Sequence, residues 1–116
     1  MADIRLTDGR LEVALTRREK IAGLLGNLRV PMAAIGHVAV VENAFDAVRG
    51  LRAPGLAIPG LTRVGTWRGR GRRTFVVARA GQPALVVDLA GQRYDRLVLS
   101  TTDAASLRDR LRAAVR

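Results

Sequence analysis

Arginines gathered within a few residues are the part of this sequence with the clearest chemical use. The stretch TWRGRGRRTF, residues 66–75, holds four of them with two glycines in between: Arg68, Arg70, Arg72 and Arg73. Guanidinium groups are planar forks that bind phosphates and carboxylates through paired hydrogen bonds, so these arginines could hold an anionic group. A mechanical interpretation competes with this one, because Gly69 and Gly71 supply the positive φ of a tight hairpin and arginines at its tip keep the end of a sheet soluble. The sequence leaves both interpretations open.

The positive charge of the chain is concentrated around this stretch. The whole sequence has a net charge of +10, from 20 basic and 10 acidic residues. Residues 49–79 hold eight arginines and no acid, which leaves twelve basic and ten acidic residues, a balance of +2, for the other 85 positions. Such an asymmetry favours nucleic acid, an anionic membrane surface or an acidic protein as partner. Codon usage in a GC-rich genome, which favours arginine over lysine, is the alternative explanation of the positive charge. Every basic residue except Lys20 is an arginine.

Residues that could carry out catalysis or bind a metal are scarce. The sequence has no cysteine, which excludes thiol chemistry, disulfides and cysteine-based metal sites. His37 is the only histidine, and a catalytic triad would have to combine it with Ser100 or Ser106, which lie far from it in the sequence. We expect this histidine to be held by hydrogen bonds in or beside the wall of a β-barrel. We therefore predict no enzyme activity, no catalytic residue, no metal site, no cofactor and no small-molecule substrate.

Signals for export or membrane insertion are missing from the sequence. The first stretch, MADIRLTDGRLEV, carries acids where a signal peptide needs a basic region followed by an apolar run. No apolar run reaches the roughly 20 residues that span a bilayer. A length of 116 residues suits one domain with a single core, covering residues 1–116. We therefore expect one soluble, cytoplasmic domain.

Apolar alternation in the first half of the chain predicts short strands. Residues 4–6 and 11–15 flank the turn signal TDG, which indicates an antiparallel pair. A capping box followed by apolar residues at helical spacing predicts a short helix after the second strand, at residues 17–25. Strands are expected again at residues 28–30 and 35–42. The second of these is apolar on both faces, which is typical of a central strand.

The middle of the chain is expected to contain a helix of about one and a half turns and then a loop. Asn43 is a suitable N-cap and Gly50 a suitable stop for that helix. Residues 51–60, LRAPGLAIPG, contain two Pro-Gly pairs, which predict an ordered loop without regular structure.

Glycine-rich turns in the second half separate apolar runs at hairpin spacing. This pattern predicts an antiparallel meander rather than strands joined by crossover helices. The expected strands are residues 61–68, 74–79, 84–89 and 96–99. A C-terminal helix is expected from about Asp103, with Leu107, Leu111 and Val115 as its apolar stripe.

About seven strands and one amphipathic helix leave unpaired edges unless the sheet closes. The expected architecture is therefore mostly β (α+β by content): a small antiparallel barrel with the C-terminal helix plugging it. The stretches FDAVRGLRAPGLAIPGLTRVGTWRGRGRRTF and ALVVDLAGQRYDRLVLS resemble a family of small, uncharacterised bacterial pleckstrin-homology-like (PH-like) domains of actinobacterial type. The most typical part is the loop through Pro54 and Gly60 into Gly65, Thr66 and Trp67. The resemblance implies a PH-like barrel and a non-enzymatic module.

The resemblance brings no binding residue with it. Phosphoinositide-binding PH domains hold lipid phosphates with basic residues on the first two strands and the loop between them. This chain has the acid-containing TDG there, flanked only by Arg5 and Arg10.

Two hypotheses for function follow. The first is a binding or assembly module that takes a protein partner, or a second copy of itself, at the loop of residues 52–60 and the arginine hairpin, with Leu56 and Ile58 as apolar anchors. The second is a binder of nucleic acid or acidic lipid. Its contacts would be Arg49, Arg52, Arg63, Arg68, Arg70, Arg72 and Arg73. Trp67 shares a face with Arg63, so it extends this patch if the face is exterior and belongs to the core if it is interior.

Overall fold

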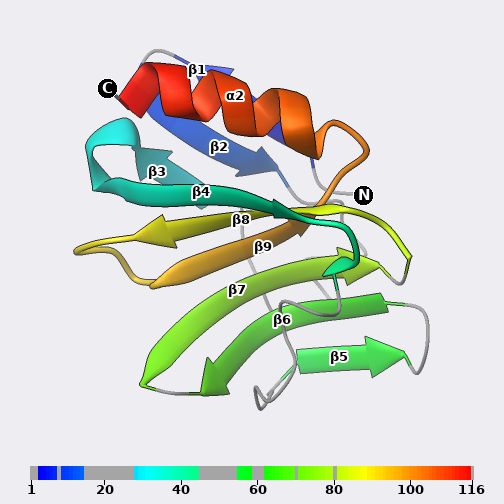
Figure 1. Cartoon of the computed structure of the whole chain (residues 1–116). Coiled ribbons are helices and arrows are strands. Elements are labelled where there is room, and N and C mark those ends of the chain that lie inside the picture. The colour runs from blue at the N-terminus through cyan, green and yellow to red at the C-terminus, as the bar shows by residue number, and fades with distance from the viewer. Residues whose placement is uncertain are drawn as a thin grey trace.

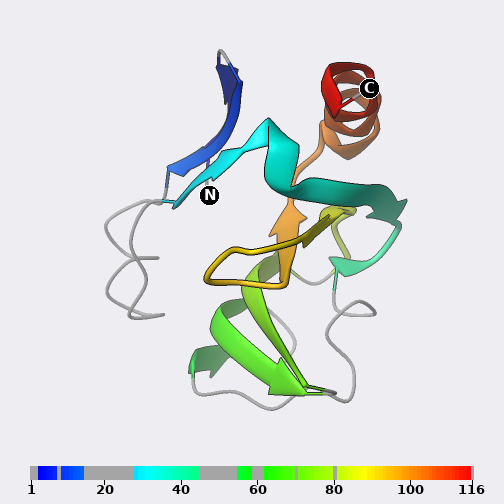
Figure 2. The same ribbon diagram turned by 90° about the vertical axis from the view of Figure 1, so that its left-hand side faces the viewer.

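The computed structural model describes residues 3–7, 9–14, 28–44, 55–58, 62–69, 71–79 and 81–115. These residues form an antiparallel sheet of three strands, a mixed sheet of six strands, a 3₁₀ turn and a C-terminal helix, α2 (Figure 1). The smaller sheet and α2 stand side by side above the larger sheet (Figure 2). The mostly β composition and the C-terminal helix predicted from the sequence are confirmed.

The smaller sheet contains the first three strands in the order β1-β2-β3. Their bounds are β1 Asp3–Thr7, β2 Arg10–Ala14 and β3 Leu28–Pro31. The turn between β1 and β2 includes Gly9, whose φ of 72° is a left-handed value that glycine adopts without a Cβ clash. Leu11 and Val30 lie opposite one another and are buried, as is Val13. The hairpin around TDG and the strand at 28–30 are thus confirmed.

The larger sheet contains the remaining six strands in the order β4-β8-β9-β7-β6-β5. Their bounds are β4 Ile35–Val41, β5 Gly55–Ile58, β6 Thr62–Gly69, β7 Arg72–Arg79, β8 Ala84–Leu89 and β9 Arg96–Ser100. All neighbours in this sheet are antiparallel except β7 and β9, which are parallel.

The predicted meander is wrong at the turn of residues 80–83. Strands β7 and β8 are consecutive in sequence, but β9 lies between them and pairs with both. Leu97 and Leu99 belong to the buried cluster on one face of β9, whereas Val98 belongs to the cluster on the other face. A strand that is apolar on both faces loses least by taking a central position, so β9 occupies the middle of the sheet.

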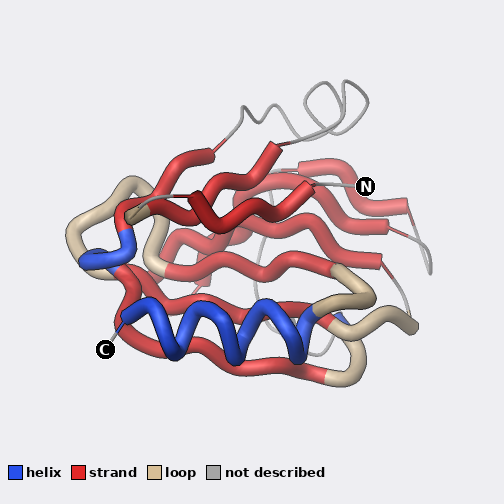
Figure 3. The backbone as a smooth tube through the Cα atoms, turned by 90° about the horizontal axis from the view of Figure 1, so that it is seen from above, coloured by secondary structure: helices blue, strands red, loops and turns tan. Residues whose placement is uncertain are grey.

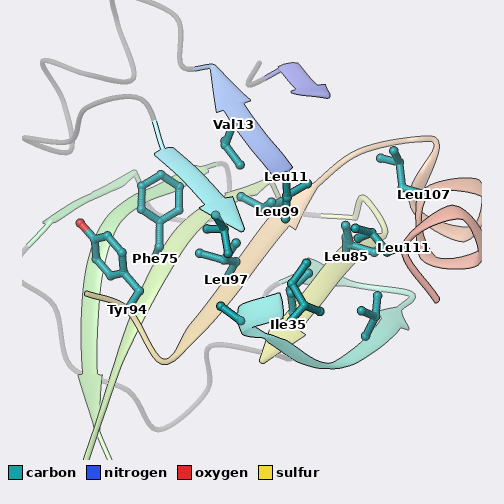
Figure 4. Packing of buried hydrophobic residues seen from close by; sticks show 14 of the residues in the cluster. Leu11, Val13, Ile35, Phe75, Leu85, Tyr94, Leu97, Leu99, Leu107 and Leu111 are labelled. Atoms are coloured by element: carbon teal, nitrogen blue, oxygen red, sulfur yellow. The ribbon is translucent and has the colours of Figure 1, made fainter. Parts of the chain in front are cut away.

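The main core fills the space between the large sheet, the small sheet and α2. Helix α2, Ala104–Val115, buries Leu107 and Leu111 against β4, β8 and the 3₁₀ turn at Met32–Ala34. The helix runs roughly along the strands that it covers (Figure 3). Leucines from β2, β8 and β9 meet between these layers together with Phe75 of β7 (Figure 4). Leu107 and Leu111 of the predicted apolar stripe therefore form the contact that docks the helix on the sheet.

A second, smaller cluster is buried on the other face of the large sheet. It includes Trp67 of β6, which is 4% exposed, together with Val76, Val86 and Val98. Trp67 pairs with Thr74 across the β6–β7 hairpin, and Thr74 is also buried. Of the two alternatives for this tryptophan, the structure supports the core, because the ring lies among buried apolar residues.

Three expectations about elements differ from the structure, and two further ones fall outside its described part. The described strands do not close into a barrel, since β1 and β3 end one sheet and β4 and β5 end the other. The strand at Ile35–Val41, expected to be central, is one of these edges, and α2 packs against it. Residues 51–60, expected to lack regular structure, contain strand β5, because Gly55–Ile58, between the prolines of the two Pro-Gly pairs, is hydrogen-bonded to β6. The helix predicted at 17–25 and the helix predicted after Asn43 lie outside the described residues, apart from the beginning of the latter.

Candidate binding surface

The arginine stretch forms the end of a β-hairpin. Strands β6 and β7 pair from Thr62 with Arg79 to Gly69 with Arg72. Gly71 in the turn has a φ of 73°, a left-handed value that costs residues with a Cβ about 1 kcal/mol or more. The hairpin predicted from the glycines is confirmed. It places the exposed side chains of Arg72 and Arg73 at one end of the large sheet.

The β8–β9 hairpin reaches the same end of the sheet. Because β9 runs parallel to β7, Arg96 lies beside Thr74. The Arg73 N–H donates to Asp95 Oδ2 at 2.8 Å, and the Asp95 N–H donates to the Arg73 carbonyl oxygen at 2.8 Å. These bonds join the two hairpin ends and bring two further arginines to the first pair. We call the resulting group the arginine end: Arg72, Arg73, Arg93 and Arg96.

Two residues of the arginine end are held by neighbours in the β8–β9 hairpin. Arg96 Nε donates to Asp88 Oδ1 at 2.6 Å, in an ion pair whose side chains are 31% and 32% exposed. The guanidinium carbon of exposed Arg93 lies 5.6 Å from the centre of the Tyr94 ring, a cation–π contact. Tyr94 in turn packs edge-on against Phe75 of β7. The hairpin is thus anchored in the core beside its charged tip.

The exposed arginines of β7 do not share one face. Side chains alternate along a strand, so Arg73 lies on the face of Phe75, whereas Arg72 lies on the face of Val76. Within the described part of the chain, neither Arg72 nor Arg73 forms an ion pair. Arg79, also exposed, lies at the opposite end of the strand. The three exposed arginines of β7 therefore lie at both ends of the strand, two at the turn of the β6–β7 hairpin and one at the opposite end.

Nine residues were predicted to bind a partner. They fall into three groups according to how much of each residue the structure describes. The first, with described side chains, consists of Arg72 and Arg73. The second lies in strands for which the register is described, and consists of Leu56, Ile58, Arg63 and Arg68. The third lies outside the described residues, and consists of Arg49, Arg52 and Arg70. The sequence analysis missed Arg93 and Arg96, because only the parallel pairing of β7 and β9 brings them to the arginine hairpin.

The two edge strands of the large sheet differ in how they are covered. At β4, Arg112 Nη2 of α2 donates to the Val38 carbonyl oxygen at 2.9 Å. At β5, the one described neighbour is β6, which it meets from Gly55 opposite Gly65 to Ile58 opposite Thr62. The four residues of β5, Gly-Leu-Ala-Ile, carry no charge. An uncharged edge strand is a template on which another extended chain can pair.

His37 and Ser100, one of the two serines that a catalytic triad could use, lie apart in the sheet. His37 is exposed on β4 and pairs with Asp88, whereas Ser100 is buried on β9 and pairs with Ala84. Positions 84 and 88 are four residues apart on β8, which corresponds to about 13 Å. The Ser100 hydroxyl accepts the Arg79 N–H at 2.8 Å, so it has a structural contact already. Within the described residues, no group of three or more His, Asp or Glu side chains could hold a metal ion.

In comparisons with known proteins, no protein-family model, no curated protein and no solved structure matches this chain. Among its described helices, none is both long enough and apolar enough to span a membrane.

Proposed function

We propose that this chain is a non-enzymatic binding or assembly module of the PH-like kind, which takes a protein partner at residues 49–79. Two sheets packed about one core with a C-terminal helix are compatible with a PH-like architecture. The segment 49–79 contains the uncharged edge strand β5 and the arginine hairpin, so backbone pairing and charge are available within one stretch of chain.

The position of β5 at the end of the described sheet, with β6 as its one described neighbour, is the observation that carries this proposal. Backbone N–H and C=O groups on the outer side of an edge strand bind extended segments of other proteins by strand addition. The other edge of the same sheet is less available, because the Arg112 side chain already occupies the Val38 carbonyl oxygen. A protein partner is therefore expected at β5 rather than at β4.

Site-specific photo-crosslinking in the native host cells tests this proposal. A photoreactive amino acid replaces Ala57 in β5, and the matched control replaces Ala105, which is exposed on α2. We expect a discrete covalent adduct with a protein at position 57 and none at position 105. Equal labelling at both positions, or no protein adduct at position 57, would contradict a protein-binding role for this edge.

Binding of an anionic surface is the second candidate, and the parallel pairing of β7 with β9 favours it. That pairing adds Arg93 and Arg96 to the exposed Arg72 and Arg73. A nucleic acid or an acidic lipid surface presents many phosphates, for which guanidinium groups are suited. The alternation of Arg72 and Arg73 between two faces limits how many of them one flat surface can reach.

Salt dependence tests the second candidate. If four arginines contact phosphates, a fourfold rise in salt weakens binding to a labelled oligonucleotide on the order of a hundredfold. The double variant Arg72→Gln/Arg73→Gln is expected to lose most of this binding. The control Arg29→Gln/Arg110→Gln removes the same charge from exposed positions in β3 and α2 and is expected to retain it. Equal losses in the two variants, or binding insensitive to salt, would exclude a phosphate site at the arginine end.

A further inference from the structure

A row of charged side chains lies on one face of the large sheet, at the arginine end. Arg96 of β9 lies beside Thr74 of β7 and opposite Asp88 of β8. On the other side of Asp88 lies exposed His37 of β4. Residues in register on neighbouring strands point to the same side of a sheet. That side is the face of the second, smaller cluster, because Val98, two residues beyond Arg96, belongs to this cluster.

Two guanidinium groups come close together on this face. Arg72 precedes Thr74 by two positions on β7, so its exposed side chain points to the same side as that of Arg96. Two residues along a strand and one strand spacing across the sheet place the Cα atoms of Arg72 and Arg96 about 8 Å apart. Half of this separation is less than the length of an arginine side chain. Both guanidinium groups can therefore reach one small anion between them.

Asp88 restricts the orientation of one of these two arginines. The Arg96 Nε donates to Asp88 Oδ1 at 2.6 Å. A guanidinium has five N–H donors, and this hydrogen bond uses the one at Nε. The end of the group, with its Nη1 and Nη2 donors, is left for a second anion. A side chain that is already held loses less rotamer freedom when it binds, so Arg96 is partly preorganised for an anion.

The opposite face of the same sheet end is less favourable for an anion. Arg73 points to that face, and its N–H donates to Oδ2 of exposed Asp95 at 2.8 Å. Within the described part of the chain this carboxylate forms no ion pair, so an anion that approaches Arg73 meets negative charge. The acid beside Arg96 is instead engaged by the arginine itself. Anion binding is therefore favoured on the face of Arg72 and Arg96.

We propose that Arg72 and Arg96 together bind a single phosphate group, a phosphomonoester dianion, and that Asp88 is a positioning residue for Arg96. One bidentate guanidinium satisfies the two oxygens of a carboxylate, whereas a phosphomonoester has three terminal oxygens and up to two negative charges, which suit two guanidiniums. The inference rests on the second candidate function. It narrows an anionic surface at the whole arginine end to one phosphate group on one face.

NMR titration of the full, ¹⁵N-labelled chain tests the inference. The probes are inorganic phosphate and a capped phosphoserine, each added at constant ionic strength against chloride and at a pH above about 6, where the second phosphate proton is lost. We expect saturable shifts of the Arg72 and Arg96 side-chain Nε–H signals with both probes. Tighter binding of the capped phosphoserine would identify a phosphorylated protein as the source of the group, and equal binding would identify free phosphate. No saturable shift at these two arginines would overturn the inference.

The adjacent arginines Arg72 and Arg73 provide a matched pair of variants, with the same loss of charge on opposite faces. Arg72→Gln is expected to weaken phosphate binding about tenfold or more, because charge-assisted hydrogen bonds are lost. Arg73→Gln is expected to change it by less than about twofold, since this side chain lies on the other face. Equal weakening by the two substitutions would show that total charge, and not a site on one face, attracts the phosphate.

Substitution of Asp88 separates positioning from charge. Asp88→Ala makes the site more positive, so binding would become stronger if charge alone acted. If Asp88 positions Arg96, this variant weakens phosphate binding about threefold to tenfold, whereas Asp88→Asn, which keeps an oxygen acceptor for Nε, retains most of it. The control Asp109→Ala removes the acid that pairs with Arg108 on α2 and is expected to leave binding unaltered. Stronger binding by Asp88→Ala would refute the positioning role.

Failure of the inference differs from failure of the second candidate function. If the labelled oligonucleotide binds with steep salt dependence, and Arg72→Gln and Arg73→Gln weaken it equally, the anionic-surface candidate stands and the single-phosphate site is wrong. If neither phosphate nor oligonucleotide binds, both are wrong. The ¹H–¹⁵N spectrum of each variant shows whether it is folded, and the pair Arg72→Gln and Arg73→Gln decides the inference even if Asp88→Ala does not fold.

Discussion

The contact between Phe75 and Tyr94 reports directly on the topology of the large sheet. Phe75 lies in β7 and Tyr94 precedes β9, and their ring centres are 5.2 Å apart with an interplanar angle of 75°. In a simple meander β8 would separate β7 from β9, so a contact between these rings is expected when β9 lies beside β7, as the pairing of the two strands shows. We predict that the substitutions Phe75→Leu and Tyr94→Leu are energetically coupled, the double variant losing less stability than the sum of the two single variants.

The size of the coupling follows from the geometry and burial of the rings. Phe75 is 1% exposed and Tyr94 is 6% exposed, so solvent does not weaken the contact between them. An edge-to-face pair at this separation contributes about 0.5–1.5 kcal/mol beyond the burial of its area. Each single substitution is expected to destabilise the fold by about 1–3 kcal/mol. The coupling free energy is expected to be about 1 kcal/mol.

Equilibrium unfolding in urea of the wild type, both single variants and the double variant measures this coupling. The control cycle combines Tyr94→Leu with Leu107→Ala, whose side chain lies on the far side of the same cluster in Figure 4. The control pair is expected to be additive within about 0.5 kcal/mol. A coupling below about 0.3 kcal/mol between Phe75 and Tyr94, or the same coupling in both cycles, would refute the placement of β9 beside β7.

Three further substitutions test the packing of α2, the cover of β4 and the arginine turn. Leu111→Ala removes a fully buried side chain and is expected to lower the free energy of unfolding in urea by about 2–5 kcal/mol. The exposed control Ala113→Ser is expected to change it by less than about 0.5 kcal/mol. Arg112→Met keeps the aliphatic stem but loses the hydrogen bond to the Val38 carbonyl oxygen, a loss of about 1 kcal/mol that faster amide exchange at the end of α2 would reveal. Gly71→Ala introduces a Cβ that meets no atom within 4 Å, so only the left-handed φ opposes it. A cost of about 1 kcal/mol is expected from thermal unfolding, and no cost would contradict the positive φ.

Local patterns were sufficient for the elements whose partners are close in sequence. TDG predicted the β1–β2 hairpin, and the glycines beside Arg72 predicted the β6–β7 hairpin, because a tight turn restricts φ at particular residues. The spacing of Leu107 and Leu111 predicted the buried face of α2. These predictions depend on a few consecutive residues, and the structure confirms them.

Patterns of burial were insufficient where the neighbour is distant in sequence. The run at Ile35–Val41 is apolar on both faces like a central strand, but α2 rather than a strand covers part of it. The Pro-Gly pairs at residues 54–55 and 59–60 indicated a loop, but the four residues Gly55–Ile58 between the two prolines are enough to pair with β6. In both places the sequence pattern shows an apolar segment, but it does not determine which other element will cover that segment or form a sheet with it.

The sequence by itself determined the charge of this protein, its lack of thiol chemistry, its hairpin turns and the amphipathic stripe of its last helix. Each of these depends on residue type or on spacing within a few positions. Only the tertiary structure decided that β9 enters between β7 and β8, which joins Arg73 to Asp95 and brings Arg93 to the arginine end. Only it separated a covered edge at β4 from an edge at β5 with one described neighbour. The physical reason is that strand order is selected by burial of whole faces, to which residues far apart in the chain contribute together.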